Sequence, residues 1–338
     1  MRQVVVTRYG APEVLELREA PDPQPGDGQV RIRVRAAGVN FADVLARVGL
    51  YPDAPKPPVV VGYEVAGRID AVGANVRTRH EGDRVLAFTQ FGGYADTVVV
   101  PAELVFPAPS RLSDAELAAI PVNYITAFIA LYRQANVTAG ETVLVHNAGG
   151  GVGVAAVQLA RLRRAVIIGT ASASKHDALR AFGVDHAIDY RTADVPAEVR
   201  RITGGRGADV VLDAIGGRSF KASYDLLAPL GRMVMFGVAS ISAGEKRSWW
   251  RTLATIAQLP SFRPLSLMNR NRGVFGLNVG HLWGETRQLA TAMDTILTEI
   301  DVGRLQPVVA KTFPLERAGD AHRFLQSRSN IGKVVLTT

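Results

Sequence analysis

A glycine-rich segment at 148–153 has the residue types that hold the phosphates of a dinucleotide. It matches the pattern G-x-G-x-x-G, with Ala148 in place of the first glycine. In this pattern Gly150 allows the backbone to approach a pyrophosphate, and Gly153 allows a helix to pack closely on a sheet. An apolar run precedes the segment and a helical pattern follows it, which predicts a helix N-terminus whose N–H groups favour anions. The predicted binding residues are Ala148, Gly149, Gly150, Gly151, Val152 and Gly153.

The end of the next predicted strand, at 166–169, indicates which dinucleotide is preferred. A site for NAD places Asp or Glu there to bind the ribose hydroxyls. This chain has small residues, hydroxyls and a lysine over 169–175, and no acid. Because a charge-assisted hydrogen bond contributes about 1.5–3 kcal/mol, one contact from Lys175 gives roughly 10- to 100-fold preference for a 2′-phosphate. We therefore expect NADPH; in the alternative, Lys175 begins an exposed helix and touches nothing. The expected contacts are Gly169, Thr170, Ser172 and Lys175.

Metal chemistry based on thiolates is excluded, because the chain has no cysteine. Disulfides and thiolate zinc sites are excluded for the same reason. None of the six histidines lies in a pattern typical of a catalytic triad or a metal pair. His146, on the strand before the glycine turn, is more typical of a satisfied core residue. We expect no metal.

The first hundred residues are predicted to form a β-rich domain. Residues 29–36 alternate polar and apolar side chains, the pattern of a half-buried strand. Further short apolar runs at 59–62, 68–73 and 98–100 are separated by Gly and Pro, which is typical of a partly open barrel.

The pattern changes near residue 113, where Ser113 and Glu116 have the spacing of a helix-capping box. Beyond it, short strands alternate with helices, and this rhythm predicts an α/β domain with a doubly wound parallel sheet. The predicted strands are 143–146, 166–169, 186–189, 209–213 and 232–236.

Length and charge restrict the function classes. At about 100–200 residues per domain, 338 residues predict two domains. The net charge of +8 favours anionic partners, but no run of five basic residues and no basic-aromatic RNA-binding pattern occurs, so nucleic acid is not expected as a partner. The chain begins with a strand pattern rather than a signal peptide, and its longest apolar stretch, 143–160, contains four glycines. We expect a cytoplasmic protein.

Residues 239–272 interrupt the strand–helix rhythm with six basic residues, one acid and interleaved aromatic side chains. Three interpretations stay open for this basic aromatic insertion: a solvated surface excursion, a lid over the substrate cleft, or an amphipathic contact with anionic lipid.

One segment identifies a family resemblance. Residues 62–73 begin Gly62-Tyr63-Glu64 and carry glycines at 67 and 73, and Gly-Asp-Arg-Val follows at 82–85. This resembles the medium-chain dehydrogenase/reductase superfamily, whose pattern is G-H-E-x-x-G-x(5)-G and then G-D-R-V. The resemblance implies a GroES-like catalytic domain formed by 1–118 and 273–338, around a Rossmann NADP-binding domain at 119–272.

The departures from the zinc-bearing members are informative. A cysteine ligand would fall near Asn40 and a histidine ligand at Tyr63, and Glu64 alone does not hold zinc. Residues 38–43 and 49–52 are similar to the zinc-independent, zeta-crystallin-like quinone oxidoreductases. Residues 122–127 and 169–176 are similar to the branch that contains the synaptic-vesicle membrane protein homologues. The resemblance implies hydride transfer from NADPH to quinones or α,β-unsaturated carbonyls.

The resemblance also implies site residues. It places Asn40 and Thr126 near the nicotinamide, and Lys175, Tyr190 and Arg328 around the adenosine 2′-phosphate. Ordinary alternatives are a turn residue for Asn40, the cap of a strand end for Tyr190 and a solvated surface arginine for Arg328. The other expected cofactor contacts are Phe236, Gly237 and Asn330.

A quinone or enone that accepts hydride becomes a phenolate or enolate, whose oxygen needs a hydrogen-bond donor or a proton. The candidate donors are Asn40, Tyr51 and Tyr63; the alternative for Tyr51 is a packed loop aromatic.

A homodimer is expected by family habit, with 275–279 as the candidate edge strand. Two rival functions stay open: a 2-enoyl-thioester reductase, and an NADPH-binding module that contacts an anionic membrane or a partner through 245–272.

Overall fold

The computed structural model of the chain describes residues 1–242 and 249–338, which form two compact units. One unit contains Met1–Ile125 and 280–338, and the other contains 126–242 and 249–279. The borders thus lie at 125/126 and 279/280, where the sequence indicated 118/119 and 272/273. The second border moves because residues Gly273–Gly276 extend the sheet of the second unit.

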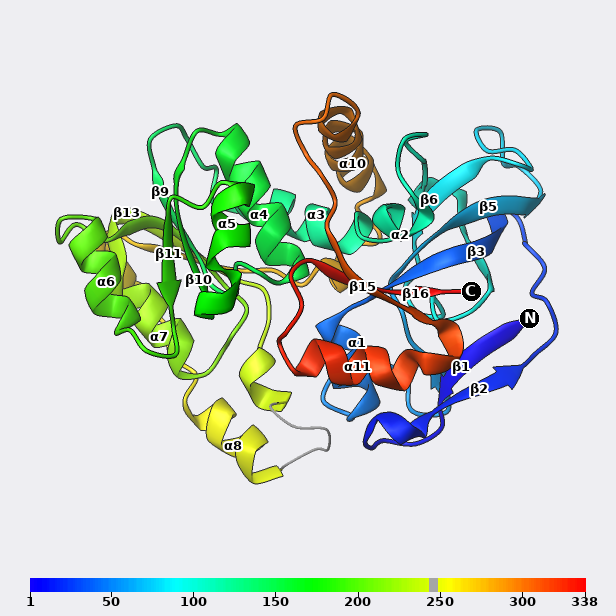
Figure 1. Ribbon diagram of the computed structural model, residues 1–338, viewed down its shortest axis with the longest axis horizontal. Helices are drawn as coiled ribbons and strands as arrows, with labels where there is room; N and C mark the ends of the chain where they lie inside the picture. Colours follow the sequence, from blue (N-terminus) through cyan, green and yellow to red (C-terminus); the bar gives the residue numbers. More distant parts are fainter. Residues whose placement is uncertain (243–248) are drawn as a thin grey trace. The chain divides into compact units, whose positions relative to one another are not determined.

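The first unit is built on a seven-stranded sheet in the order β15-β16-β3-β5-β6-β8, and β7 also pairs with β3. A three-stranded sheet in the order β2-β1-β4 lies in the same unit (Figure 1). In β3 the side chains of Val30, Ile32 and Val34 are buried while the arginines between them are half-buried, so the predicted strand over 29–36 is confirmed. The strands are β1 (Arg2–Val6), β2 (Leu15–Glu19), β3 (Gln29–Val39), β4 (Val59–Val60), β5 (Glu64–Val72), β6 (Arg84–Phe88), β7 (Thr97–Pro101), β8 (Val105–Pro107), β15 (Val309–Pro314) and β16 (Lys333–Thr337).

Helices follow the strands of this unit or pack against them. Helix α1 (Phe41–Arg47) follows β3 directly, and α11 (Ala318–Gln326) packs on β15 and β16. The predicted capping box is present at α2 (Asp114–Leu117), where Ser113 Oγ accepts from the Glu116 N–H and Glu116 accepts from the Ser113 N–H. Helix α10 (Thr286–Asp301) contributes a buried apolar stripe that includes Leu289, Met293 and Ile296.

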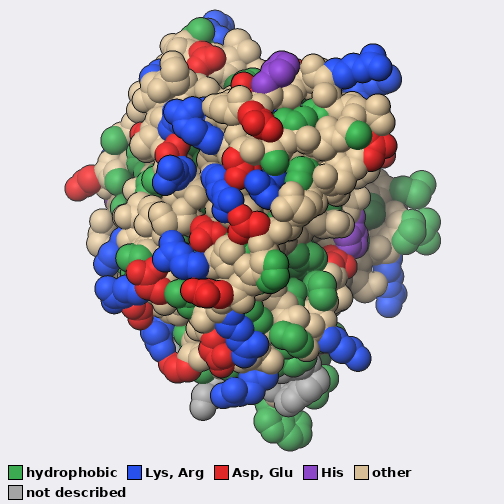
Figure 2. All heavy atoms as spheres, turned by 90° about the vertical axis from the view of Figure 1, so that its right-hand side faces the viewer, with side chains coloured by type: hydrophobic (Ala, Val, Ile, Leu, Met, Phe, Trp, Pro, Cys, Tyr) green, Lys and Arg blue, Asp and Glu red, His purple; other side chains and the backbone are tan. Residues whose placement is uncertain are grey.

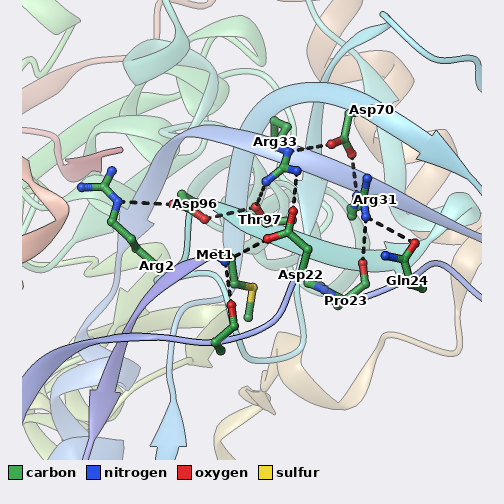
Figure 3. A network of polar contacts seen from close by, with 11 residues as sticks. Met1, Arg2, Asp22, Pro23, Gln24, Arg31, Arg33, Asp70, Asp96 and Thr97 are labelled. Carbon is green, nitrogen blue, oxygen red and sulfur yellow. Dashed lines mark hydrogen bonds and ion pairs between the residues drawn. The ribbon is translucent and has the colours of Figure 1, made fainter.

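A network of ion pairs fastens the amino terminus to the main sheet (Figure 3). Asp22 contacts the Met1 amino group at 2.8 Å and also pairs with Arg33. Asp70 on β5 accepts from Arg31 at 2.8 Å and from Arg33 at 2.6 Å. On the face that carries these strands, basic and acidic side chains lie interspersed (Figure 2). The excess positive charge therefore does not gather into a single-sign patch on this face.

The second unit contains a six-stranded parallel sheet in the order β11-β10-β9-β12-β13-β14. The chain runs outward from β9 to β11 in one direction and from β12 to β14 in the other. The predicted doubly wound Rossmann sheet is therefore confirmed, and its switch point lies between β9 and β12, where such folds bind ligands. The strands are β9 (Thr142–Val145), β10 (Val166–Ala171), β11 (His186–Asp189), β12 (Ala208–Asp213), β13 (Leu227–Met235) and β14 (Gly273–Gly276).

Helices cover both faces of this sheet. Helices α4 (Gly151–Leu162) and α5 (His176–Phe182) lie on one face, and α6 (Val195–Ile202) and α7 (Arg218–Asp225) lie on the other (Figure 1). The basic aromatic insertion contains α8 (Trp249–Ala257) and α9 (Pro264–Arg270).

One helical stretch, Asp114–Gln134, is long and apolar enough to cross a membrane by length and composition alone. It includes α3 (Pro121–Phe128), and 72% of its most apolar window is buried inside the protein. A core helix passes the same test, so the stretch is weak grounds for a membrane span.

Candidate active site

The glycine turn lies at the switch point of the parallel sheet, between β9 and α4. Gly150 is the residue before the helix and has no side chain to cap its first N–H groups. A β-carbon on Gly150 would lie 2.6 Å from Asn147 Nδ2, and one on Gly153 would lie 2.3 Å from the Asn147 carbonyl oxygen. Gly153 therefore requires glycine because the clash is with backbone, whereas a side chain at Gly150 would have to displace the Asn147 amide. The result is a helix N-terminus that no side chain caps, which fits a pyrophosphate.

Lys175 lies over this turn. It follows β10 at the end of a short 3-10 helix, Ala173–Lys175, and its side chain is only 7% exposed. A β-carbon on Gly149 would lie 3.0 Å from Lys175 Cδ and 3.6 Å from its Nζ. Burial lowers the pKa of Lys175, and the nearby positive charge of Arg191 lowers it further. The alternative of an exposed lysine that touches nothing is wrong, and the donor set at this turn fits a phosphate.

The residues at the end of β10 have different uses. A β-carbon on Gly169 would lie 3.0 Å from the Ala148 Cβ, so this glycine allows the turn to approach β10. Thr170 is 1% exposed, and its hydroxyl takes part in a hydrogen bond within the protein, because it accepts from the Asn147 N–H at 3.3 Å. Ser172 Oγ lies 3.3 Å from Ser174 Oγ. Of these side chains, Lys175 is the one placed to bind a ligand charge at the turn.

His146 is a satisfied core residue, as the sequence indicated. Ser223 Oγ donates to Asp213 at 2.7 Å, so it accepts from His146 Nε2 at 3.1 Å. His146 Nδ1 then accepts from the Thr170 hydroxyl at 3.2 Å. Burial lowers the pKa of His146, which keeps the imidazole neutral in this chain of hydrogen bonds.

The other predicted cofactor contacts are divided between the two units. Tyr190 follows β11 and is 41% exposed, and Phe236 and Gly237 follow β13 at the same carboxyl edge of the sheet. Arg328 and Asn330 belong to the first unit. The Arg328 side chain is exposed and its backbone has a φ of 57°, while Asn330 Nδ2 donates to the Gly332 carbonyl at 2.9 Å. Thr126, near the end of α3, is 6% exposed. The gathering of Tyr190 and Arg328 around a 2′-phosphate stays a prediction.

In the first unit, Asn40 belongs to a buried polar cluster that also contains Glu64, Asn123 and Lys333. Asn40 lies between β3 and α1, and its Nδ2 donates to Glu64 Oε1 at 2.9 Å. Lys333 Nζ donates to Asn40 Oδ1 at 2.6 Å, to Asn123 Oδ1 at 3.4 Å and to Glu64 Oε1. Glu64 and Lys333 are 0% and 2% exposed. The second Glu64 oxygen accepts from the Val122 N–H at 2.7 Å, so both of its oxygens are hydrogen-bonded.

Sequence reasoning did not find Lys333 and Asn123. Lys333 opens an otherwise apolar strand, Lys333–Thr337, whose next three residues are buried. A lysine at the start of a buried strand needs a partner for its charge. This requirement is the signal by which the sequence could have indicated Lys333. Asn123 belongs to the segment 122–127 that carries the family resemblance, but nothing in the sequence indicated its contact with Lys333.

The candidate donors Tyr51 and Tyr63 lie together, with ring centroids 6.0 Å apart and planes at 78°. Tyr63 also packs against Phe91 at 5.1 Å and is 5% exposed. Burial raises the pKa of Tyr63, and the charge of Asp43 raises it further. The Tyr63 phenol is therefore suited to donate a hydrogen bond and poorly suited to release its proton.

Asp43 connects the Asn40 loop to the interior. Its carboxylate accepts from the Asn40 N–H at 2.7 Å, the Gly62 N–H at 3.0 Å and the Tyr94 hydroxyl at 3.1 Å. Tyr94 Oη therefore accepts from His322 Nε2 at 3.0 Å. Burial raises the pKa of Asp43 to about 7, although these hydrogen bonds and the charge of Lys333 oppose the shift.

The residues of this cluster do not fit a zinc ion. Asn40 and Tyr63 stand where the zinc-bearing relatives carry a thiolate and an imidazole, and the Glu64 carboxylate is taken up by Lys333. Over 1–242 and 249–338 no three His, Cys, Asp or Glu side chains form a group that could hold a metal ion. Zinc needs three or four such ligands.

Comparisons with known proteins agree with this architecture. Residues 26–110 match the alcohol dehydrogenase GroES-like domain, and residues 182–336 match the family described as zinc-binding dehydrogenase. The synaptic vesicle membrane protein VAT-1 homolog of Danio rerio is 42% identical over 339 residues, covering 100% of this chain and 70% of that protein.

Two solved structures are similar over nearly the whole chain. Escherichia coli quinone oxidoreductase complexed with NADPH has a TM-score of 0.88 at 28% identity, covering 100% of both chains. The CurK enoyl reductase has a TM-score of 0.85 at 29% identity, covering 99% of this chain and 98% of its own. The resemblance inferred from the sequence is confirmed: the chain is an oxidoreductase of the medium-chain dehydrogenase/reductase superfamily and lies close to the VAT-1 homologues.

Proposed function

We propose that this oxidoreductase is independent of zinc and transfers hydride from NADPH to quinones or related α,β-unsaturated carbonyls. The observation that carries the proposal is the position of Lys175. Its buried ammonium lies over the glycine turn at the switch point of the sheet, and residues 169–175 contain no carboxylate. This arrangement favours a cofactor with an additional phosphate.

The roles of the individual residues follow from their chemistry. The N-terminus of α4 and the turn at 148–153 hold the pyrophosphate, and Lys175 binds the 2′-phosphate together with Tyr190 and Arg328. Bound NADPH supplies the hydride. Asn40 donates a hydrogen bond to the acceptor oxygen as it becomes a phenolate or enolate, and Tyr51 and Tyr63 are the further donor candidates. Phe236, Gly237 and Asn330 contribute backbone and packing contacts to the cofactor.

The test is the oxidation of NADPH, followed by its absorbance, with quinones, enones and a crotonyl thioester as acceptors. Parallel reactions contain EDTA or replace NADPH with NADH. Turnover of quinones that survives EDTA and prefers NADPH is the expected result. Preference for NADH contradicts the role of Lys175, and loss of turnover in EDTA contradicts independence from zinc. Turnover of the thioester alone supports the 2-enoyl-thioester reductase; the CurK neighbour is named an enoyl reductase.

A second candidate function, contact with an anionic membrane, is favoured by the outer face of the basic aromatic insertion. In α8 the side chains of Thr252 and Thr255 are buried, while Trp250, Leu253 and Ile256 are 84%, 56% and 52% exposed. Leu265 and Met268 in α9 are 72% and 68% exposed. Residues 243–248, which include three of the charged residues of 245–272, lie outside the described residues.

This candidate predicts co-sedimentation with vesicles that contain an anionic lipid, and weaker co-sedimentation with neutral vesicles. Replacing Trp250, Leu253 and Ile256 with serine should abolish it without loss of NADPH binding. The matched control replaces Leu17, an exposed apolar side chain of the first unit, with serine. Equal binding of the triple variant and the control to the vesicles excludes the membrane contact at this face.

Two further expectations belong to this proposal. Strand β14 is one of the two edge strands of the parallel sheet and its Phe275 is 37% exposed, which supports a homodimer through that edge. Light scattering of the eluting protein measures its mass, and a monomer at micromolar concentration contradicts the homodimer.

We expect the protein in the cytoplasmic fraction, and recovery with membranes after a salt wash contradicts this.

A further inference from the structure

The polar cluster around Lys333 fixes the orientation of the Asn40 amide. An ammonium group only donates hydrogen bonds, and an ionised carboxylate only accepts them. Lys333 must therefore face Asn40 Oδ1, and Glu64 must face Asn40 Nδ2, in agreement with the distances of 2.6 and 2.9 Å. One of the two N–H bonds of the amide is used by Glu64. The amide has a single allowed orientation, and within 1–242 and 249–338 its one hydrogen-bond donation goes to Glu64.

Lys333 is not suited to act as an acid or base itself. Its three N–H bonds are directed to Glu64, Asn40 and Asn123, and its side chain is 2% exposed. The carboxylate compensates the buried positive charge, and the Val122 N–H in turn stabilises that carboxylate. A group enclosed in this way acts on the reaction through its neighbours.

The contact with the ammonium also changes the Asn40 amide electronically. A cation on the carbonyl oxygen polarises the amide and strengthens its N–H groups as donors, by about 10–30% for one bond in a chain of hydrogen bonds. A polarised N–H is suited to stabilise a developing oxyanion. Asn40 also stands where zinc-bearing relatives place a metal ligand, and a fixed positive charge from the chain itself lies beside it.

We propose that Lys333 is a positioning residue, a built-in cation that holds and polarises the Asn40 amide so that its second N–H binds the oxygen of the hydride acceptor. The proposal rests on the proposed reductase function. It disagrees with the zinc-binding description of the matched family, because the cluster supplies its own cation in place of a metal ion.

The variant that tests this replaces the charged pair with a neutral pair of similar shape, Lys333→Met with Glu64→Gln. Lys333→Met alone would leave a buried carboxylate and risks unfolding. The paired change leaves no charge, and the amide oxygen introduced by Glu64→Gln can still accept from the Val122 N–H. The matched control is Lys311→Met, which removes an exposed lysine from the neighbouring strand β15. Asn40→Ala removes the proposed donor.

Three results are expected from kinetics and binding. The double variant should lose roughly 10- to 100-fold in kcat, while its Kd for NADPH, measured by fluorescence titration, stays within about twofold. Lys311→Met should change neither quantity. Adding Asn40→Ala to the double variant should cost little further activity, because the double variant has already lost the group that positions the Asn40 donor. Independent, additive losses or an unchanged kcat overturn the proposal.

A spectroscopic measurement keeps the inference separate from the proposed function. The side-chain amide signals of Asn40 in a protein labelled with ¹⁵N-asparagine are assigned by their loss in Asn40→Ala. They should shift in the Lys333→Met/Glu64→Gln variant and stay in place in Lys311→Met. If no acceptor is turned over, the reductase function fails while these signals still report on the positioning. Unshifted Asn40 signals overturn the positioning whatever the activity.

Discussion

Lys175 and Lys333 are both buried, yet the groups around them have opposite effects on the positive charge. Lys333 lies against a carboxylate and two amide oxygens inside the first unit. Lys175 lies over a turn of glycines in the second unit, where burial and the neighbouring cation Arg191 both lower its pKa. The first environment compensates a charge, and the second disfavours it.

The difference separates two uses of a buried lysine. Desolvating a charge is costly unless another group compensates it. For Lys333 the chain provides that compensation, so the ammonium orders its neighbours permanently. For Lys175, burial and Arg191 lower the pKa, and the negative charge of a bound phosphate would raise it. Four substitutions test this contrast.

The largest expected effect comes from removing the compensation at Lys333. Glu64→Gln leaves a buried ammonium without its carboxylate and should lower the free energy of unfolding by about 3–5 kcal/mol. Urea denaturation followed by circular dichroism measures this loss. The control is Glu16→Gln, whose side chain is 45% exposed and pairs with Arg18, and it should leave the free energy of unfolding nearly unchanged. Similar losses of unfolding free energy in both variants would mean that burial of the ion pair does not determine the cost of removing its carboxylate.

Asp43, close to the same cluster, should make stability depend on pH. Its pKa rises from 3.8 to about 7 on folding because of burial, so between these values the folded chain holds a proton that the unfolded chain has released. The free energy of unfolding should therefore fall as the pH rises through this range, by about 1.4 kcal/mol per pH unit. The contribution is full below the unfolded value and is lost above pH 7.

The measurement compares the wild type with Asp43→Asn at several pH values between 4 and 7. The variant lacks this titration, so the difference in unfolding free energy should change steadily in its favour as the pH rises. His322, whose pKa is lowered by burial, contributes a slope of opposite sign. That slope occurs in both proteins and cancels in the difference. A pH-independent difference contradicts the raised pKa of Asp43.

Lys175→Met should weaken binding of NADPH roughly 10- to 100-fold, because a charge-assisted hydrogen bond contributes about 1.5–3 kcal/mol. Binding of NADH should change by less than about twofold. The thermal midpoint should stay the same or rise, because the substitution removes a desolvated charge. Lys221→Met, which removes an exposed lysine of the same unit, is the control. Equal losses for both cofactors would assign Lys175 to the turn itself rather than to the 2′-phosphate.

The same contrast explains what the sequence could predict. The glycine turn and the end of β10 are contiguous segments, and the strand and helix patterns around them are local, so the sequence could predict where Gly150, Gly153 and Lys175 lie, while their contacts with a cofactor stay predictions. Thr170 was assigned to the cofactor, and its hydroxyl instead serves Asn147 and His146. That contact depends on the register of two neighbouring strands, which no local pattern specifies.

The polar cluster of the first unit depends entirely on long-range contacts. It joins the end of β3, the start of β5, helix α3 and the start of β16, so Asn40 and Lys333 are 293 residues apart along the chain. The family pattern indicated Asn40 and Glu64 singly. The partner that determines how the Asn40 amide points was visible only once β16 was seen to pair with β3.

The smallest expected effect comes from the network that joins the amino terminus to the main sheet (Figure 3). Asp70 is 26% exposed at its side chain and pairs with Arg31 and Arg33. Burial tends to raise its pKa, but the hydrogen bonds from the two arginines prevail and lower it. Asp70→Asn should therefore cost about 0.2–1 kcal/mol at neutral pH.

Two conditions should erase even this loss. At 1 M salt the screening length falls to about 3 Å, so the difference between Asp70→Asn and the wild type should shrink. As the pH falls below 3.8, the ordinary aspartate value, and then through the lower pKa of folded Asp70, the difference should shrink again, since a lowered pKa stabilises the fold only while the group is ionised. The loss in Glu64→Gln should persist in high salt because its charges are inaccessible to ions. If salt reduced both losses equally, the buried pair would behave as a surface pair, and the contrast between compensated and solvated charges would fail.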